Sequence, residues 1–292
     1  MRRSLSDMVT VITGASSGIG RALAVNLAAH GGRLVLGARR LDRLQALERE
    51  IGPDHCCRRI DVSRPGDCQQ LISAAIEKFG RLDTVVCNAG FGFARALDCM
   101  SAEDIRQIFD TNLFGTIECC RSAISIMKSQ ELRDGFRGQL MIVSSACALR
   151  GLPYFSLYAA TKAAQLSLAE GLRIELKPFN IAVTSVHPML CETDFFSTAN
   201  DLSGMNPAAL AQGGKQSPEY VADRMARAIE RPRRELWPKS MSRLSLHIAA
   251  MVPGIVDKVM GRIRDRMLRD HENRNKTVTA DSEEDSLSEI PA

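Results

Sequence analysis

The sequence predicts an α/β protein with a doubly wound parallel sheet in a single domain, and two observations lead to this expectation. Short runs of β-branched residues alternate with amphipathic stretches of helical length along most of the chain. Such alternation is typical of βαβ units, whose right-handed crossovers place helices on both faces of a parallel sheet. Glycine-rich or polar segments follow several of these strands, at the edge where ligands bind in such sheets.

Each element is recognised by its periodicity and by the residues that end it. Strands are predicted at residues 8–13, 33–37, 57–61, 82–88, 139–145, 181–187 and 235–237, where β-branched residues are dense. Helices are predicted at residues 21–30, 41–51, 67–79, 101–129, 156–177 and 217–230. Pro178 ends the fifth helix, and Ser217 followed by Pro218 is a favourable start for the sixth.

The composition is that of an ordinary globular protein. A net charge of +4 is too small to indicate a nucleic-acid partner. The nine cysteines are odd in number and contain no Cys-x-x-Cys, unlike a disulfide framework or a zinc site. They predict buried thiols in a reducing compartment, the cytoplasm, although Cys147 or Cys191 could be reactive beside the site. Residues 1–8 lack the apolar core of a secretory signal. The sequence has no run of about 18 apolar residues, so no spanning helix is predicted.

A glycine-rich turn joins the first predicted strand to the first helix. Gly14, Gly18 and Gly20 form a G-x-x-x-G-x-G pattern there. Glycine permits a tight turn and lets the backbone approach a ligand closely, and the N-terminus of the following helix attracts anions. A plain turn would need only one glycine, so the three together predict a site for the pyrophosphate of a dinucleotide.

Three further residues predict proton and hydride chemistry. Tyr158 and Lys162 are four residues apart and therefore share one helix face. A cation favours the ionised form of a phenol, whose pKa is otherwise about 10. Ser145 lies thirteen residues before Tyr158, and strand alternation turns its neighbour Ser144 to the opposite face. Tyr154 competes weakly with Tyr158, because no lysine follows it at the same spacing.

As an ordered set, these features resemble the short-chain dehydrogenase/reductase family over about residues 8–230. The matching positions are the glycine turn, Asn88-Ala89-Gly90, Asn112, Ser145, Tyr158 and Lys162. The resemblance implies a Rossmann-type fold and NAD(P)(H)-dependent oxidoreduction of alcohols and carbonyls, with the reaction's hydride carried by the cofactor.

The resemblance also implies a role for each residue of the catalytic set. Tyr158 would be the general acid in reduction and the general base in oxidation. Lys162 would lower the pKa of Tyr158 and hold the nicotinamide ribose. Ser145 would donate a hydrogen bond to the substrate oxygen, where negative charge develops. Asn112 would hold a water molecule that links Lys162 to solvent.

The cofactor contacts are predicted in the same way. They are Gly14, Ser16, Ser17, Gly18, Ile19, Gly20, Arg39, Asp61, Val62, Asn88, Ala89, Gly90, Tyr158, Lys162, Pro188 and Thr193. Asp61 and Val62 resemble the family's adenine contact, and Pro188 and Thr193 its nicotinamide-side loop. Two departures are Met189, where the family usually has glycine, and Cys87, where it usually has asparagine.

The charge after the second strand predicts NADP(H) as the cofactor. An acid at this point binds the ribose 2′-hydroxyl of NAD, whereas arginine accommodates the 2′-phosphate of NADP. Ala38 stands at the acidic position and Arg39 follows it. A guanidinium group suits a phosphate, so Arg39 is the expected main contact, with Arg40 or Arg43 as a second one. The alternative is that these arginines belong to a solvated loop.

The C-terminal third departs from a compact catalytic domain. Residues 191–216 carry five large apolar residues and predict a mobile lid over a hydrophobic carbonyl or alcohol substrate. Residues 231–270 form a basic, amphipathic helical extension, with ten basic and three acidic residues over 231–269. These helices either lie on an anionic membrane surface or pack beside the substrate cleft with a solvated basic face. Residues 271–292 are polar and acidic and predict a disordered tail.

Partners and alternative functions follow from the same residues. The family commonly pairs through its last helices, which predicts a homodimer. A nucleic-acid binder is disfavoured, because Trp237 is the only aromatic residue in the basic segment. The alternatives are a 3-oxoacyl thioester reductase, whose acidic carrier would meet the basic extension, and an NADP(H)-binding sensor or scaffold without turnover. The complete set of Asn112, Ser145, Tyr158 and Lys162 argues against the sensor.

Overall fold

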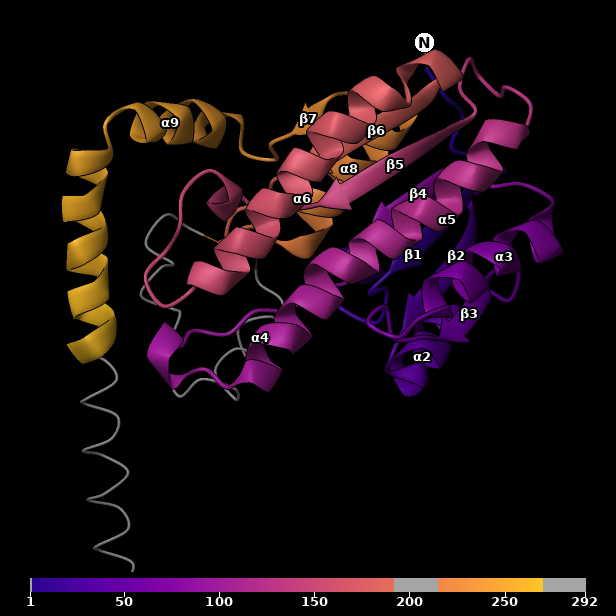
Figure 1. The fold of residues 1–292 in the computed structure, drawn as a ribbon. Coiled ribbons are helices and arrows are strands. Elements are labelled where there is room, and N and C mark those ends of the chain that lie inside the picture. The colour runs from indigo at the N-terminus through magenta and orange to yellow at the C-terminus, as the bar shows by residue number, and fades with distance from the viewer. Residues whose placement is uncertain (1, 192–214, 270–292) are drawn as a thin grey trace, which may run out of the picture.

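The computed structural model of the protein describes residues 2–191 and 215–269, and a seven-stranded parallel sheet forms its centre (Figure 1). The strand order is β3-β2-β1-β4-β5-β6-β7, so the chain builds outward from β1 in both directions. The strands are β1 (Val9–Thr13), β2 (Arg33–Ala38), β3 (Cys56–Arg59), β4 (Thr84–Cys87), β5 (Gly138–Val143), β6 (Ile181–Val186) and β7 (Glu235–Leu236). The predicted doubly wound α/β fold is confirmed.

Helices cover both faces of this sheet and bury its side chains in two apolar layers. One face packs against α1 (Gly18–Ala29), α2 (Leu41–Ile51) and α8 (Pro218–Glu230). The other packs against α3 (Asp67–Phe79), α5 (Gly115–Ser129) and α6 (Ser156–Glu175). Because the central strands are covered on both sides, β1, β4 and β5 are buried along their whole length.

Within the predicted helix at residues 101–129, the structure has a change of helix type. The chain runs as α4 (Ala102–Phe109), then as a π-helical turn (Asp110–Phe114), and then as α5. Ser101 and Asp104 form a capping box at the start of α4. A wide turn of this kind leaves no mark in hydrophobic periodicity, and such turns are frequent at functional sites.

The order of the strands creates a switch point between β1 and β4. From β1 the chain first crosses to β2 and β3 on one side, and then returns to β4 on the other. The connections that leave β1 and β4 therefore diverge at their carboxyl ends and open a crevice. The glycine turn follows β1 and Asn88 follows β4, so both predicted cofactor segments lie at this crevice.

The sheet continues past residue 230, where the sequence places the end of the catalytic domain. Glu235 and Leu236 of β7 pair in parallel with Ser185 and Val186 of β6. The chain then enters α9 (Ser240–Met251) and a further helix over Pro253–Arg269. The two helices meet at a bend of 106°, and Figure 1 shows the second one standing to the side of the sheet.

No single helix in residues 2–191 and 215–269 is long and apolar enough to cross a membrane. The bent pair Arg243–Ala249 and Pro253–Arg269 passes that test only when its two parts are taken together, by length and composition. The predicted acidic tail, nearly all of the predicted lid and Thr193 lie outside the described residues.

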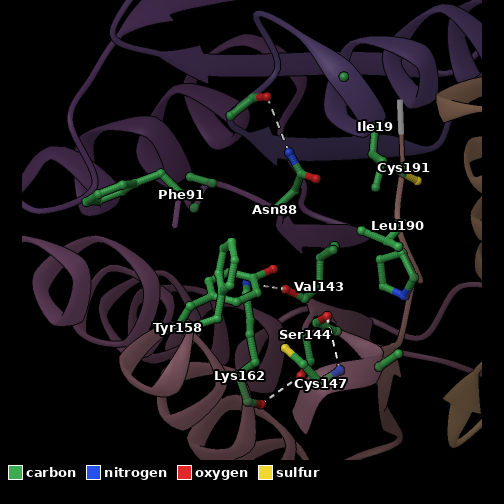
Figure 2. A pocket seen from close by; sticks show the side chains of 18 of the residues that line it. Ile19, Asn88, Phe91, Val143, Ser144, Cys147, Tyr158, Lys162, Leu190 and Cys191 are labelled. Carbon is green, nitrogen blue, oxygen red and sulfur yellow. Dashed lines mark hydrogen bonds between the residues drawn. The ribbon is translucent and has the colours of Figure 1, made fainter. Parts of the chain in front are cut away.

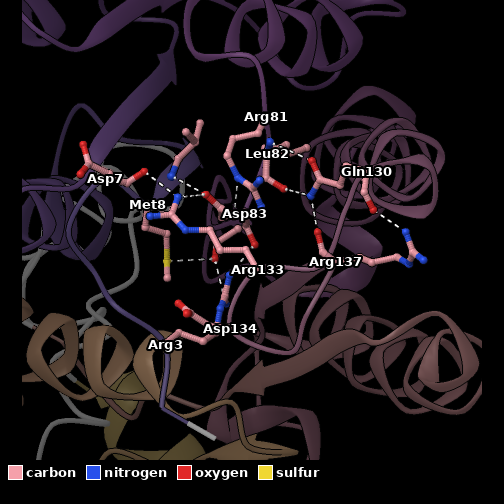
Figure 3. Close-up of polar contacts among 12 residues, drawn as sticks. Arg3, Asp7, Met8, Arg81, Leu82, Asp83, Gln130, Arg133, Asp134 and Arg137 are labelled. Atoms are coloured by element: carbon pink, nitrogen blue, oxygen red, sulfur yellow. Dashed lines mark hydrogen bonds and ion pairs between the residues drawn. The ribbon is translucent and has the colours of Figure 1, made fainter.

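A buried ionic cluster ties the N-terminal segment to the amino edge of the sheet, opposite the site (Figure 3). Arg3 donates to Gln139 Oε1 at 2.8 Å and to the Asp83 carbonyl at 2.9 Å. The Asp83 carboxylate accepts from the Val9 amide at 2.9 Å and pairs with Arg81 and Arg133. Burial lowers the pKa of Arg3 to about 10, while the charge of Asp83 opposes that shift.

Asp83→Ala should lower the free energy of unfolding by about 3 kcal/mol, because it leaves a buried cation less compensated and the Val9 amide without its acceptor. The measurement is a urea titration of both proteins. Asp7→Ala is the matched control, since Asp7 makes an exposed ion pair with Arg33 that should contribute at most about 1 kcal/mol. Equal losses in the two variants would show that the buried cluster adds nothing to stability.

Candidate active site

A cavity of about 710 Å³ opens at the carboxyl edge of the sheet, at the switch point. The glycine turn, the segments that follow β2 to β6 and the start of α6 line it. Figure 2 shows Tyr158 and Lys162 beside Val143, with Asn88 and Ile19 across the cavity from them. All predicted site residues within the described part of the chain line this cavity, except Gly20 and Asn112.

The glycine turn packs so closely against the segment after β4 that a residue with a Cβ would not fit at Gly14 or Gly20. Gly14 has φ +68°, and a Cβ there would lie 2.8 Å from Ala89 Cα. A Cβ on Gly20 would lie 2.5 Å from the Gly14 carbonyl oxygen and from Asn88 Nδ2. Asn88 Nδ2 itself donates to the Thr13 and Gly14 carbonyls at 3.0 and 3.2 Å. The glycines are thus required by contact and not only by backbone conformation.

The N-terminus of α1 faces this cavity with its first backbone N–H groups not capped by a side chain. Ser17 is the N-cap residue, but its side chain makes no capping hydrogen bond. Gly18 and Ile19 of the first turn line the cavity. N–H groups at a helix N-terminus are donors without helical partners and carry a positive partial charge. The turn therefore fits the pyrophosphate of a dinucleotide.

Two arginines line the part of the cavity that follows β2. Arg39 and Arg40 both lie there beside Ala38. Arg40 donates to Ser17 Oγ at 2.7 Å and to Ser16 Oγ at 3.3 Å, which joins this cation to the glycine turn. Arg43 is not among the lining residues.

Asp61 lines the cavity near Arg39 and Arg40. It follows β3, whose last residue is Arg59, so the strand ends two residues earlier than predicted. Burial tends to raise the pKa of Asp61, but hydrogen bonds from Ser63 and the charge of Arg39 hold it below its ordinary value. Asp61 is therefore a carboxylate partly neutralised by Arg39, and Val62 lines the cavity beside it.

Ser145 and Tyr158 meet at the opposite part of the cavity. Ser145 follows β5 by two residues and Tyr158 lies in the first turn of α6. Burial raises the pKa of Tyr158 well above its ordinary value, although a hydrogen bond with Ser145 acts in the other direction. Ser144 Oγ instead donates to the Lys162 carbonyl at 2.7 Å, so Ser145 is the serine that serves Tyr158.

Lys162 lines the cavity beside Tyr158, and its ammonium is hydrogen-bonded within the protein. Its ammonium lies 5.6 Å from the centre of the Tyr158 ring and donates to the Val143 carbonyl at 3.0 Å and to Gln165 Oε1 at 2.9 Å. Burial lowers the pKa of Lys162 to about 8. The ammonium is thus held beside the tyrosine ring by Val143 and Gln165, and its effect on the pKa of Tyr158 stays a prediction.

Asn112 lies in the π-helical turn and is held on all sides. Its side-chain oxygen accepts from the Phe91 amide at 3.0 Å, and its side-chain nitrogen donates to the Phe91 carbonyl and to Thr161 Oγ1. Its backbone carbonyl accepts from Gln165 Nε2. Gln165 therefore links Asn112 to Lys162, a role that the sequence analysis missed. The available signal was a buried amide three residues after Lys162 on the same helix face.

His187 is a second residue that the sequence analysis missed. It is fully buried, its Nδ1 lies 3.2 Å from the Ser145 carbonyl, and its ring stacks on Trp237 at 4.3 Å. Burial lowers the pKa of His187, which favours the neutral ring. It precedes Pro188, which lines the cavity as predicted. The stack connects Ser145 with the start of the C-terminal extension.

The chain is similar in sequence to known oxidoreductases. The sequence profile described as short chain dehydrogenase matches residues 8–203. The chain belongs to this family. It is 33% identical to the uncharacterized oxidoreductase YxnA of Bacillus subtilis, over 89% of this chain and 73% of that protein. It is 41% identical to the 11-beta-hydroxysteroid dehydrogenase-like protein 4A of Arabidopsis thaliana, over 64% of this chain and 62% of that protein.

Two solved structures of oxidoreductases share the fold. The 3-ketoacyl-(acyl-carrier-protein) reductase from Brucella melitensis, in complex with NADH, has a TM-score of 0.69 and 27% identity, over 80% of this chain and 97% of its own. The alcohol dehydrogenase from Thermococcus sibiricus, in complex with 5-hydroxy-NADP, has a TM-score of 0.67 and 30% identity, over 79% and 95%. The protein is thus a short-chain oxidoreductase, and the predicted family is confirmed.

The two thiols beside the site should be unreactive at neutral pH. Burial raises the pKa of Cys147 to about 11 and that of Cys191 to about 12. Because only the thiolate reacts, iodoacetamide at pH 7.5 should modify the exposed Cys99 and leave both buried thiols intact. Peptide mass mapping after timed exposure measures this. Rapid modification of Cys147 with loss of activity would identify it as a reactive thiol.

Proposed function

We propose that the protein interconverts a hydrophobic ketone or aldehyde and its alcohol by hydride transfer with NADP(H). The observation that carries the proposal is the pairing of Ser145 with Tyr158 in one cavity with an uncapped helix N-terminus and two arginines. The N-terminus of α1 suits the phosphate groups of a cofactor. The Ser145–Tyr158 end of the cavity suits an oxygen of the substrate. Asn112, Ser145, Tyr158 and Lys162 argue against a sensor without turnover.

The residues divide the work of proton transfer. The cofactor supplies the hydride. Ser145 donates a hydrogen bond to the substrate oxygen, and Tyr158 gives that oxygen its proton in reduction. The raised pKa of Tyr158 favours the protonated phenol, which is the form that reduction needs. Lys162 is held by Val143 and Gln165 and would bind the nicotinamide ribose.

The preference for the phosphorylated cofactor rests on charge. Arg39 and Arg40 line the cavity where the ribose 2′-position lies in this fold, and Ala38 supplies no carboxylate there. Two guanidinium groups at this position would form charge-assisted hydrogen bonds with a phosphate, and they would interact only weakly with a hydroxyl.

The substrate class rests on the remaining wall of the cavity. Leu152 and Phe155 come from the segment before α6, and Leu246, Met260 and Ile263 come from the two C-terminal helices. This wall is apolar, whereas the reacting end is polar, which suits a mostly hydrophobic molecule with one carbonyl or hydroxyl group. The relative named for hydroxysteroid dehydrogenase activity is consistent with this class.

A second candidate is reduction of a 3-oxoacyl thioester. The structural similarity to the Brucella melitensis reductase favours it. Both candidates would use the same residues for proton transfer. Comparing turnover of an aryl or alicyclic ketone with that of acetoacetyl thioesters separates them. We also propose a homodimer in the cytoplasm, as the sequence predicts, to be tested by light scattering and fractionation.

Arg39→Ala should weaken NADPH binding by about 10- to 100-fold and leave NADH binding nearly unchanged, because a charge-assisted hydrogen bond to phosphate contributes about 1.5–3 kcal/mol. Nicotinamide fluorescence titration of the purified protein measures both affinities. Arg43→Ala is the matched control, because Arg43 does not line the cavity. If wild-type protein prefers NADH, the charge argument is wrong while the fold and the catalytic set stand.

Tyr158→Phe should reduce turnover by roughly 10²- to 10⁴-fold, because it removes the general acid, and should leave NADPH binding largely intact. Steady-state NADPH oxidation with a panel of hydrophobic carbonyls measures turnover, and the same fluorescence titration measures binding. Tyr154→Phe serves as the control, since Tyr154 does not line the cavity, and should be nearly as active as wild type. Near-normal turnover in Tyr158→Phe would refute the assignment.

A further inference from the structure

The C-terminal helices carry apolar side chains on two separate faces. The inner face lines the cavity through Leu246 and Ala249 of α9 and Val256, Met260 and Ile263 of the helix over Pro253–Arg269. The inner face also places Met267, which is fully buried, against Phe155 and Ala94. Packing beside the substrate cleft, one of the two alternatives from the sequence, therefore accounts for this face alone.

A second apolar face points away from the cavity. Its members are Leu244, Ile248, Met251, Val252, Ile255 and Val259, and all six are exposed. Met251 is 82% exposed and Ile255 66% exposed. Their spacing of three or four residues on each helix makes one stripe that crosses the bend. Contiguous exposed apolar surface of this kind marks an interaction site in soluble proteins, whereas single exposed residues do not.

Basic side chains extend this outer face toward the end of the second helix. Arg262 and Arg266 follow Ile255 and Val259 at the same helical spacing, with Lys258 and Arg269 beside them. All four cations are exposed. In the part of the chain that the structure describes, none of them is paired with a carboxylate, whereas Asp257 pairs with Arg150 and Asp265 with Arg264. The outer face is therefore apolar at the bend and cationic beyond it.

We propose that this outer face docks the protein on the surface of an anionic lipid bilayer. Exposed apolar side chains beside a row of cations are what an interfacial amphipathic helix presents to acyl chains and lipid phosphates. The helices would lie on the bilayer and not cross it. The bend of 106° interrupts the pair, and the cations at 258, 262, 264, 266 and 269 are costly inside a bilayer, so both features favour a surface position.

A second copy of the chain fits this face less well than an anionic surface. A twofold contact through the apolar part of this face would offer no carboxylates to the cationic row, because its partner surface is the same patch. Like charges across an interface cost free energy, whereas phosphate groups compensate them. The charge of the face thus favours lipid.

Docking is independent of the proposed reaction, since binding is measured without turnover. It also gives the reaction a route for its substrate. The same two helices contact the cavity on one side and the lipid surface on the other. A hydrophobic carbonyl dissolved in the bilayer would then reach the cavity past these helices.

Sedimentation with vesicles tests the proposal. Full-length protein is mixed at low salt with phosphatidylcholine vesicles, with and without 30% phosphatidylglycerol. Binding should require the anionic lipid and weaken with added salt. Arg262→Gln with Arg266→Gln should weaken it about thirtyfold, from about 1 kcal/mol for each cation. Met251→Ser with Ile255→Ser should weaken it at least about tenfold.

Ile174→Ser is the matched control, because Ile174 is 72% exposed on α6 and away from the proposed face, and it should bind as wild type does. Folding of each variant is checked by reduction of a water-soluble carbonyl or, should none be found, by dinucleotide binding. Failure of wild type to bind anionic vesicles, or equal binding by all variants, would overturn the proposal. So would a dimer in light scattering that Met251→Ser with Ile255→Ser converts to monomer, since the face would then bind a second copy.

Discussion

The close contact between the turn after β1 and the end of β4 is the constraint on which the site depends. Gly14 and Gly20 leave no room for a side chain against Ala89 and Asn88. Thr13 Oγ1 strengthens the contact by accepting from the Asn88 and Ala89 amides. This contact between the turn and the end of β4 fixes where α1 begins, and therefore where phosphate groups would bind. The next residue, Gly90, packs against Asn112 and Lys162. A Cβ there would lie 3.0 Å from Asn112 Oδ1 and 3.5 Å from Lys162 Nζ.

Burial favours the neutral forms of both ionisable groups at the reacting end. Burial raises the pKa of Tyr158 and lowers that of Lys162 to about 8. No nearby carboxylate offsets either shift. The polar atoms of Lys162 and Asn112 are nevertheless satisfied, through Gln165 and Phe91. A fully bonded network in a low dielectric is rigid, so it holds the reacting side chains in place at little cost on binding. The raised pKa keeps the proton on Tyr158, which is the form that the proposed reduction needs.

The sequence predicted the layers of the fold and the strand boundaries to within two residues, because periodicity records which faces are buried. It also predicted most of the polar rim, since residues that follow parallel strands share one edge. It could not predict Gln165 or His187, whose partners come from distant elements through side-chain contact. The π-helical turn at Asn112 was missed for a similar reason. For residues 231–270 it left two alternatives open, because a periodic apolar pattern does not distinguish one wide face from two separate ones.

The shape of the substrate space depends on contacts at both ends of the C-terminal extension. At its start, β7 is held to β6, and Trp237 stacks on His187, whose Nδ1 lies 3.2 Å from the carbonyl of Ser145. At its end, Met267 is buried against Phe155, which lies three residues before Tyr158. The apolar wall is thus joined to the two residues that contact the substrate oxygen in the proposed reaction. A change of the wall that moves either contact would therefore alter proton transfer as well as substrate fit, so size selectivity and rate should be coupled in this enzyme.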